Sequence, residues 1–164
     1  MTIVYDADES RAIDSLGALC NVAEPLGLKI AIEFVAVTPA WNTLASAAEL
    51  VTKIGHRNLA LDIDILHLAR SGGTPADVAA LESRLIAHAQ LSDVADLTAT
   101  ADYGEEAAAN RVTPGDGVFP LDAFLRALPK GTPLELEVPQ PPDRPAIERL
   151  RHVVTATRQL LDAL

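Results

Sequence analysis

The sequence has a single cysteine and no long apolar run, and each shortage excludes a class of protein. With only Cys20, neither a disulfide scaffold nor a cysteine-rich metal site can form within one chain. No apolar run is long enough to span a bilayer, and the N-terminus lacks the basic-then-apolar order of a signal peptide. Cys20 falls on the apolar side of an expected helix and is predicted to be a small core residue. We therefore expect a cytoplasmic protein with no membrane contact.

Positive charge is also scarce. Lys and Arg number 13 against 23 Asp and Glu, which gives a formal net charge of −10. Such a surface repels phosphate backbones, so nucleic-acid binding is not expected. The glycine motifs of phosphate loops and dinucleotide sites are absent. What remains is a chain of 164 residues, 49% of them apolar and rich in Ala and Leu, which predicts one globular domain over residues 1–164.

Helical and strand patterns alternate along the chain. Helices are expected over 8–26, 43–54, 74–83, 121–128 and 146–164, and strands over 28–34, 58–66, 85–91 and 132–138. Residues Thr2–Tyr5 are interpreted as the remnant of a preceding strand. The long connection over 92–120 is predicted to contain a short helix near 105–110. Alternation of this kind predicts parallel strands joined by right-handed crossovers.

Each expected strand has one apolar and one polar face. In the second strand, for example, Leu59, Leu61 and Ile63 alternate with Asp62 and Asp64. A sheet covered by helices on both sides would be apolar on both faces. A polar inner face is natural for a barrel that hosts a site, so we predict an α/β fold: a parallel (β/α) half-barrel of four strands with flanking helices, from a TIM-barrel fold.

Near the carboxyl end of each polar face lies one good oxygen ligand: Glu33, Asp64, Gln90 and Glu137. Crowded carboxylates repel one another unless a cation or protons neutralise them. Such oxygen ligands suit a divalent ion, Mn²⁺ or Mg²⁺. The alternative is four separate residues in polar pockets. One layer deeper, three residues are predicted to be buried and paired as structural support: Asp62, His88 and Glu135.

At these residues the chain resembles the sugar phosphate isomerase/epimerase family, the xylose-isomerase-like TIM barrels. The resemblance covers nearly the whole chain but only the C-terminal half of that family's barrel. The matching segments are GLKIAIEF, LDIDILHLARSG, IAHAQLSD, NRVTPGDGVFPLDAFLRAL and PLELEVP. The set is fairly specific for the superfamily and weak for any one reaction, because several activities share the scaffold.

The resemblance implies a role for each site residue. The implied metal ligands are Glu33, Asp64, Gln90 and Glu137. The third ligand is often histidine in an H-x-x-D pattern, but members resembling hydroxypyruvate isomerases also use glutamine there. Glu33 and Glu137 are implied to act as acid and base as well. His67, from the D-x-x-H element, and Arg111, which begins R-x-x-P-G-x-G, are implied to contact substrate oxygens.

Three functions follow as alternatives. The first is a divalent-metal-dependent isomerase or epimerase that acts on a small sugar or hydroxy-keto acid by proton transfer through an enediolate. The second is a metal-dependent lyase or dehydratase on the same scaffold. The third is a non-catalytic truncated fragment. Since a full barrel needs eight strands, we expect the chain to form a homodimer or to pair with a separate N-terminal half-barrel.

Overall fold

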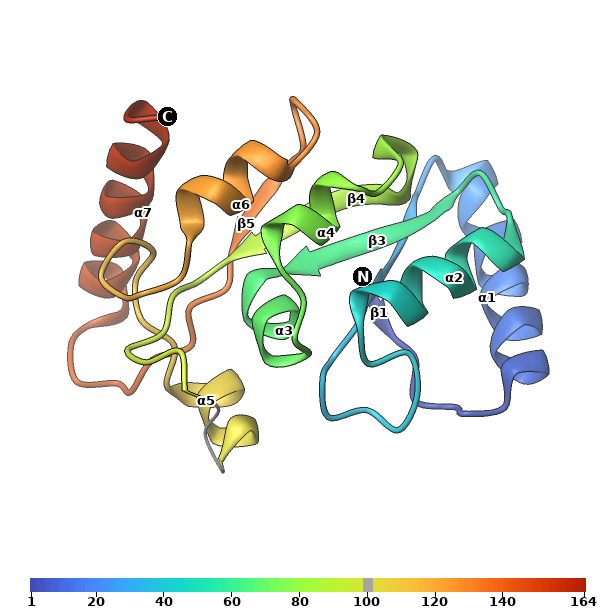
Figure 1. Cartoon of the computed structure of the whole chain (residues 1–164), viewed down its shortest axis with the longest axis horizontal. Helices are drawn as coiled ribbons and strands as arrows, with labels where there is room; N and C mark the ends of the chain where they lie inside the picture. Colours follow the sequence, from blue (N-terminus) through green and yellow to red (C-terminus); the bar gives the residue numbers. More distant parts are fainter. Residues whose placement is uncertain (99–101) are drawn as a thin grey trace.

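The computed structural model describes residues 1–98 and 102–164, and its centre is a parallel sheet (Figure 1). Within the described residues the sheet has five strands in the order β1-β2-β3-β4-β5, with every neighbouring pair parallel. The strands are β1 Thr2–Ile3, β2 Ile30–Glu33, β3 Leu59–Asp64, β4 Ile86–Leu91 and β5 Leu134–Leu136. The predicted parallel α/β architecture is therefore confirmed, and the suspected N-terminal remnant is a fifth strand at one edge.

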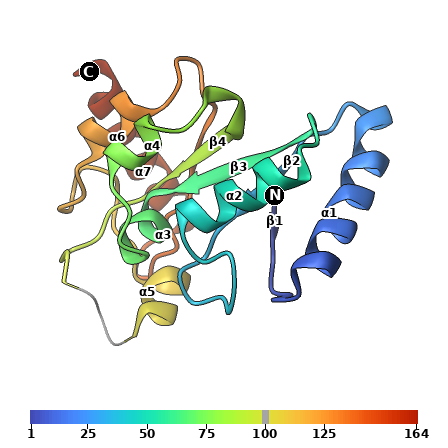
Figure 2. The same ribbon diagram turned by 45° about the vertical axis from the view of Figure 1, so that its right-hand side comes forward.

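Helices follow the strands along the chain. Their bounds are α1 Glu9–Ala23, α2 Leu44–Ile54, α3 Ile65–Arg70, α4 Pro75–Ala79, α5 Tyr103–Ala109, α6 Leu121–Ala127 and α7 Ala146–Asp162, with 3₁₀ turns at Glu24–Leu26 and Ser83–Leu85. Figure 1 shows α2, α4 and α6 over one face of the sheet, and Figure 2 shows α1 beyond α2. One face of the sheet is thus covered by helices, as the apolar faces of the strands predict.

Local signals explain where the longer helices begin and end. Asp8 accepts a hydrogen bond from the backbone N–H of Arg11 at the start of α1, and Thr43 forms a capping box at the start of α2. Gly55 ends α2 with φ of 64°, a left-handed conformation that favours glycine. The sequence predicted these helices because the caps lie beside clear helical periodicity.

The predicted carboxyl end of the second strand was wrong. It was predicted to reach Leu66, but β3 ends at Asp64 and α3 begins at Ile65. The apolar run that continues the strand is a short buried helix, and the Asp64 side chain caps it by accepting the backbone N–H of Leu66 at 2.7 Å. A run of apolar residues does not by itself distinguish a buried strand from a buried helix.

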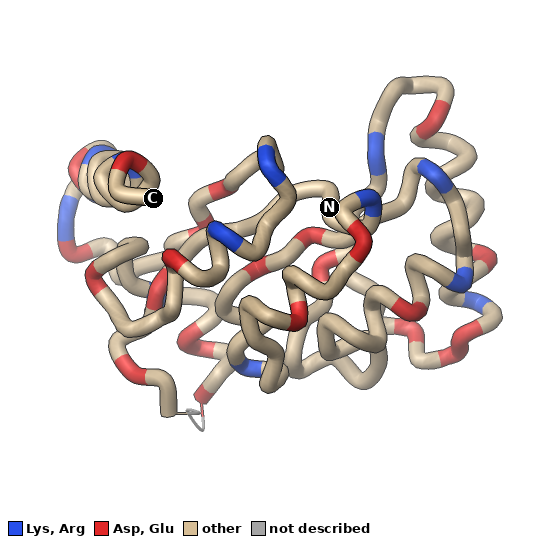
Figure 3. The backbone as a smooth tube through the Cα atoms, turned by 45° about the horizontal axis from the view of Figure 1, so that its top comes forward, with Lys and Arg blue, Asp and Glu red and all other residues tan. Residues whose placement is uncertain are grey.

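The apolar core lies between the sheet and its helices. The side chains of Ile32, Leu61 and Ile63 are fully buried there, and Cys20 is buried as predicted. No helix in the described ranges is long and apolar enough to cross a membrane. Figure 3 shows acidic residues spread along the whole chain rather than collected at one end.

The deeper polar layer differs from its prediction. Asp62 is fully buried, whereas His88 is half-buried and Glu135 is exposed. The expectation of a buried layer was therefore wrong for Glu135. His88 Nε2 still lies 3.1 Å from Glu135 Oε2 and 3.4 Å from Asp62 Oδ1, so the three side chains share one face of the sheet.

Candidate metal centre

The four predicted oxygen ligands lie at or beside the carboxyl ends of four neighbouring strands. Glu33 ends β2, Asp64 ends β3, Gln90 lies near the end of β4, and Glu137 directly follows β5. Asp64 and Gln90 are register partners, so their side chains project from the same face. Glu33, Asp64 and Gln90 are each less than 5% exposed. Parallel strands thus bring chemically similar groups from distant parts of the sequence to one edge.

Asp64 uses its two oxygens for different contacts. Oδ1 caps α3, and Oδ2 lies 2.5 Å from Arg111 Nη1. The guanidinium also approaches Glu137, with Nη1 3.1 Å from Oε2, although the angle is not that of a hydrogen bond. Arg111 is 3% exposed and Asp64 is fully buried. A protein cation therefore lies between two of the predicted metal ligands, where it offsets their negative charge.

The turn after Arg111 is wrapped around Asp93. The Asp93 carboxylate accepts backbone hydrogen bonds from Gly115, Gly117 and Phe119 at 3.1, 3.2 and 2.8 Å. A Cβ at residue 117 would lie 2.4 Å from Asp93 Oδ1, so only glycine fits. The R-x-x-P-G-x-G element is therefore a carboxylate-centred turn, and it holds the segment that carries Arg111.

Burial and repulsion shift the acidity of two carboxyl groups here. Burial raises the pKa of Glu137 to about 7, and a hydrogen bond shared with Asp64 adds to the effect while Arg111 opposes it. Burial also raises the pKa of Asp62 to about 8, with the charges of Glu33 and Asp64 acting in the same direction. Burial is the larger cause of both shifts, and the negative charge of the neighbouring carboxylates adds to it.

The residues present fit a divalent ion. Gln90 Oε1 is buried and has no hydrogen-bonding partner among the described residues, so it is a free oxygen donor beside Asp64. Ligand atoms of Glu33, Asp64 and His67 all lie within 4.8 Å of one another. This grouping differs from the four predicted ligands, because it includes His67 and omits Gln90 and Glu137. Both groupings share Glu33 and Asp64 and are rich in oxygen donors, which hard cations prefer.

His67 is held in the site by contacts from two directions. Its Nε2 lies 3.2 Å from Glu33 Oε1 and 3.7 Å from Asp64 Oδ2. On the other side of the ring, Nδ1 hydrogen-bonds the hydroxyl of Tyr103. Sequence reasoning missed Tyr103, because nothing local indicates that the short helix α5 reaches α3.

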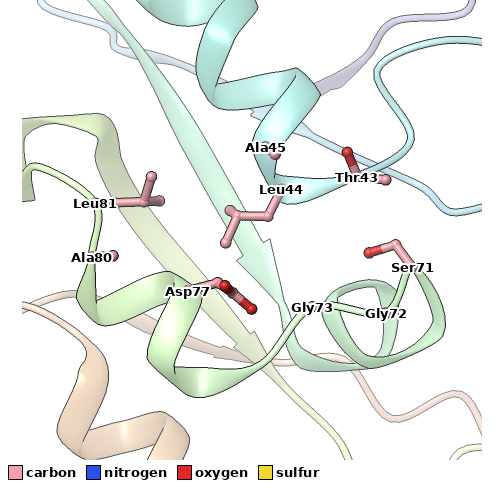
Figure 4. Close-up of a pocket in the computed structure, with 9 residues that line it drawn as sticks. All are labelled: Thr43, Leu44, Ala45, Ser71, Gly72, Gly73, Asp77, Ala80 and Leu81. Carbon is pink, nitrogen blue, oxygen red and sulfur yellow. The ribbon is translucent and has the colours of Figure 1, made fainter.

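A separate cavity of about 420 Å³ lies between α2 and α4, away from the predicted site residues (Figure 4). Leu44 and Leu81 supply apolar atoms, and Ser71 and Asp77 supply polar ones. The Asp77 carboxylate already accepts hydrogen bonds from the backbone and hydroxyl of Thr74. The Asp77 carboxylate of this cavity is therefore engaged in capping α4, in contrast to the unpaired oxygens at the strand ends.

Comparison with known proteins gives a consistent picture. The family model for the xylose isomerase-like TIM barrel matches residues 3–159. Inosose isomerase of Bacillus subtilis is 32% identical over 127 residues, which are 77% of this chain and 44% of that protein. The 3-dehydroshikimate dehydratase of Pseudomonas aeruginosa is 34% identical over 128 residues, 76% of this chain and 20% of that protein. The chain thus spans less than half the length of these relatives.

A solved structure adds a metal to the comparison. The crystal structure of an IolI protein with a bound zinc atom has a TM-score of 0.82 and 26% sequence identity. The match covers 99% of this chain and 59% of that one. Nearly all of this chain therefore corresponds to part of a longer protein, which binds zinc.

Proposed function

Because the chain belongs to the xylose isomerase-like TIM-barrel family, we propose that residues 1–164 are the metal-binding, C-terminal half of a sugar isomerase or epimerase. The proposed substrate is a small sugar or hydroxy-keto acid. The observation that carries the proposal is the carboxylate cluster at the strand ends, where Glu33 and Asp64 are buried and Glu137 is half-buried. Arg111 contacts both Asp64 and Glu137. A cytoplasmic location, expected from the single cysteine, is part of the proposal.

Four residues are proposed to hold the metal: Glu33, Asp64, Gln90 and Glu137. When bound, a divalent ion supplies a Lewis acid for the negative charge that develops on substrate oxygens during proton transfer. We propose Mn²⁺ or Mg²⁺ rather than zinc, because an amide oxygen and three carboxylates favour harder ions. The free oxygen of Gln90 supports this choice.

The protein's own groups are proposed to move the proton and orient the substrate. Glu33 and Glu137 act as base and acid. One removes a proton from the carbon next to the carbonyl, and the other returns a proton to the neighbouring carbon. In the metal-free protein burial raises the pKa of Glu137 to about 7, and a bound cation would lower this pKa and favour the ionised carboxylate that a base requires. His67 and Arg111 hydrogen-bond substrate oxygens, and their burial keeps water away from those contacts.

A dehydratase on the same scaffold is the second candidate. The observation that favours it is the relative from Pseudomonas aeruginosa, a 3-dehydroshikimate dehydratase at 34% identity. Removal of a proton next to a carbonyl begins both reactions, so the same carboxylates serve either. The two differ in whether a hydroxyl leaves afterwards.

Turnover is proposed to require a completed barrel. The chain matches 44% of the length of the Bacillus subtilis inosose isomerase. Its edge strands β1 and β5 are two and three residues long. We propose that a second copy of the chain, or a separate N-terminal half-barrel, pairs with these edges. A chain that binds metal without turnover would support the remaining alternative, a non-catalytic fragment.

Deuterium exchange tests the proposal whichever product is formed. The protein, assembled with a second copy or with an N-terminal half-barrel, is incubated in D₂O with Mn²⁺ or Mg²⁺ and either an inosose or 3-dehydroshikimate, and the substrate is followed by NMR. We expect deuterium next to the carbonyl, metal-dependent and lost in Glu33→Gln but not in the exposed control Glu82→Gln. New aromatic proton signals from 3-dehydroshikimate would indicate the dehydratase, because loss of water from this ring completes an aromatic system. Metal binding with no exchange in an assembled barrel would contradict both.

A further inference from the structure

Two helices of the described chain expose large apolar side chains, and they are the first and the last. On α1 these are Leu19 and Val22, and on α7 they are Ile147, Leu150 and Leu161, with exposed fractions between 38% and 66%. Within the described ranges, the helices from α2 to α6 expose no large apolar side chain. Figure 1 shows α1 and α7 at opposite ends of the molecule. Both ends of the half-barrel therefore carry apolar surface that the described chain leaves uncovered.

The apolar residues of α7 form two adjacent stripes. Val153 and Thr157 lie in the first stripe and are buried against the rest of the protein. The second stripe repeats at spacings of three, four and seven residues, which places its members on one side of the helix: Ile147, Leu150, Val154 and Leu161. Val154 is half-buried and the other three are exposed. An apolar face of this width fits a helix that is covered on two sides, so the second stripe indicates a further neighbour.

Each end of the sheet also has an open strand edge. Among the described residues β1 pairs only with β2, and β5 pairs only with β4. The side chain of Leu134 on β5 is exposed as well. An open edge presents N–H and C=O groups that another strand can pair with. A neighbour made of strands followed by helices would cover the edges and the apolar helix sides together, and by meeting both ends it would close the sheet into a ring.

The number of strands determines how much of the ring is missing. A parallel (β/α) barrel closes with eight strands, and the described sheet has five, so three are needed. The IolI protein gives an independent measure, because the match covers 59% of that chain and leaves 41% of it. Three strand–helix units of eight are about 38% of a barrel. A second copy would bring five strands again, which is two more than the barrel has room for.

The charge of the inner face also disfavours a second copy. Carboxylates on that face and at its strand ends outnumber the one arginine among them, Arg111: they are Glu33, Asp62, Asp64, Glu135 and Glu137. A second copy would place the same carboxylates opposite, where like charges repel one another. The side chain of Glu135 is 57% exposed, so it is open to a basic group from across the barrel. The neighbour that fits this face therefore has a basic inner side.

We propose that the two ends of this half-barrel bind a single segment of three strand–helix units that lies outside residues 1–164. The segment contacts the exposed sides of α1 and α7, pairs with β1 and β5, and directs basic side chains toward Glu135. The inference deepens the proposed function and rests on it, because it assumes a barrel that must be closed for turnover. It selects the separate half-barrel over a second copy of the chain.

Co-expression tests this pairing with a defined probe. The probe is the part of the IolI protein that the match leaves uncovered, 41% of its chain, and sedimentation with native mass spectrometry gives the composition of the complex. We expect one probe per chain, and no closed dimer of this chain alone. Leu150→Glu and Val22→Glu, at exposed sites on α7 and α1, should each weaken the complex by about tenfold or more, because each buries a charge in an apolar contact.

Ala123→Glu, at an exposed position on the intervening helix α6, is the matched control and should leave the complex unchanged. Circular dichroism checks that each variant is folded. Three results would overturn the inference: a discrete dimer of this chain alone that Leu150→Glu dissociates, the absence of a complex with the probe, or a complex that both variants leave intact. The measurement uses neither metal nor substrate. A complex that binds no metal would thus contradict the proposed function alone, and metal binding without a complex would contradict the pairing alone.

Discussion

Arg111 Nη1 lies 2.5 Å from Asp64 Oδ2, in a region where both side chains are almost completely shielded from water. The ion pair joins residues 47 positions apart in the sequence. Its consequence is that a side chain of the protein offsets the charge of Asp64 without any metal. A bound divalent ion would also bring positive charge to the Asp64 carboxylate. Metal binding should therefore affect the stability of the protein in the same direction as Arg111 does.

Arg111→Met should destabilise the metal-free protein by about 3–5 kcal/mol, because it leaves a buried carboxylate without a partner. Saturating Mg²⁺ should recover much of this loss, since the ion provides the missing charge. Urea unfolding with and without Mg²⁺ measures both values. Arg126→Met, at an exposed position on α6, is the control and should change little. An equal loss of unfolding free energy with and without Mg²⁺ would show that Arg111 does not share the charge of the metal site.

Asp62→Asn should change how stability depends on pH. Because the folded protein raises the Asp62 pKa to about 8, it holds this proton more tightly than the unfolded chain, whose value is about 3.9. The contribution of protonated Asp62 to the free energy of unfolding is therefore fully present below about pH 4 and is lost as the pH rises toward 8. The parent protein should lose up to about 1.4 kcal/mol per pH unit relative to Asp62→Asn.

Urea unfolding in the presence of a chelator, at several pH values between these limits, measures this difference. The groups that face Asp62 are Glu33, Asp64, His88, Glu135 and Glu137, and all are kept in the variant. Asp14→Asn, at an exposed position on α1, should follow the parent protein. Parallel pH curves for Asp62→Asn and the parent protein would show that Asp62 ionises normally.

Gly117→Ala should destabilise the Asp93-centred turn, because the added Cβ would lie 2.3 Å from the carbonyl oxygen of Val94. Overpacking of this kind typically costs about 1–3 kcal/mol, occasionally more. Gly104→Ala, a position on α5 where an added Cβ meets no atom within 4 Å, should instead stabilise by about 0.5–1 kcal/mol. Thermal unfolding of the two variants compares them. A stable Gly117→Ala protein would mean that the turn can rearrange.

Gln90→His should shift metal preference toward zinc. An imidazole nitrogen suits Zn²⁺ better than it suits Mg²⁺, so the ratio of the two dissociation constants should change by about tenfold or more. Competition between the two ions, followed by calorimetry, measures the ratio. The parent protein serves as the reference, and an unchanged ratio would place Gln90 outside the metal site.

The fold was largely predictable because its signals are local. Helix caps such as Thr43 and the alternation around Asp62 can be seen in a few consecutive residues. The parity of the strands also predicted that Glu33 and Asp64 would be neighbours. The strand–helix boundary at Asp64 was missed, although the same aspartate is a recognisable helix cap.

The contacts made by α5 and by Arg111 were not predictable. Tyr103 reaches His67 across 36 residues, and the ion pair between Arg70 and Glu106 joins the same two helices. No short-range pattern encodes such a contact. The motif at Arg111 marked the residue, but its pairing with Asp64 required the geometry of the turn.

Titration of the metal-free protein with Mg²⁺ or Mn²⁺ by calorimetry is the most direct examination of the proposed site. The parent protein and the exposed control Asp122→Asn should each bind one ion per chain. Asp64→Asn keeps the shape of the side chain and, once circular dichroism shows it folded, should lose that binding. Failure of the parent protein to bind either ion at saturating concentration, or equal binding by Asp64→Asn, would contradict a shared cation site at the strand ends.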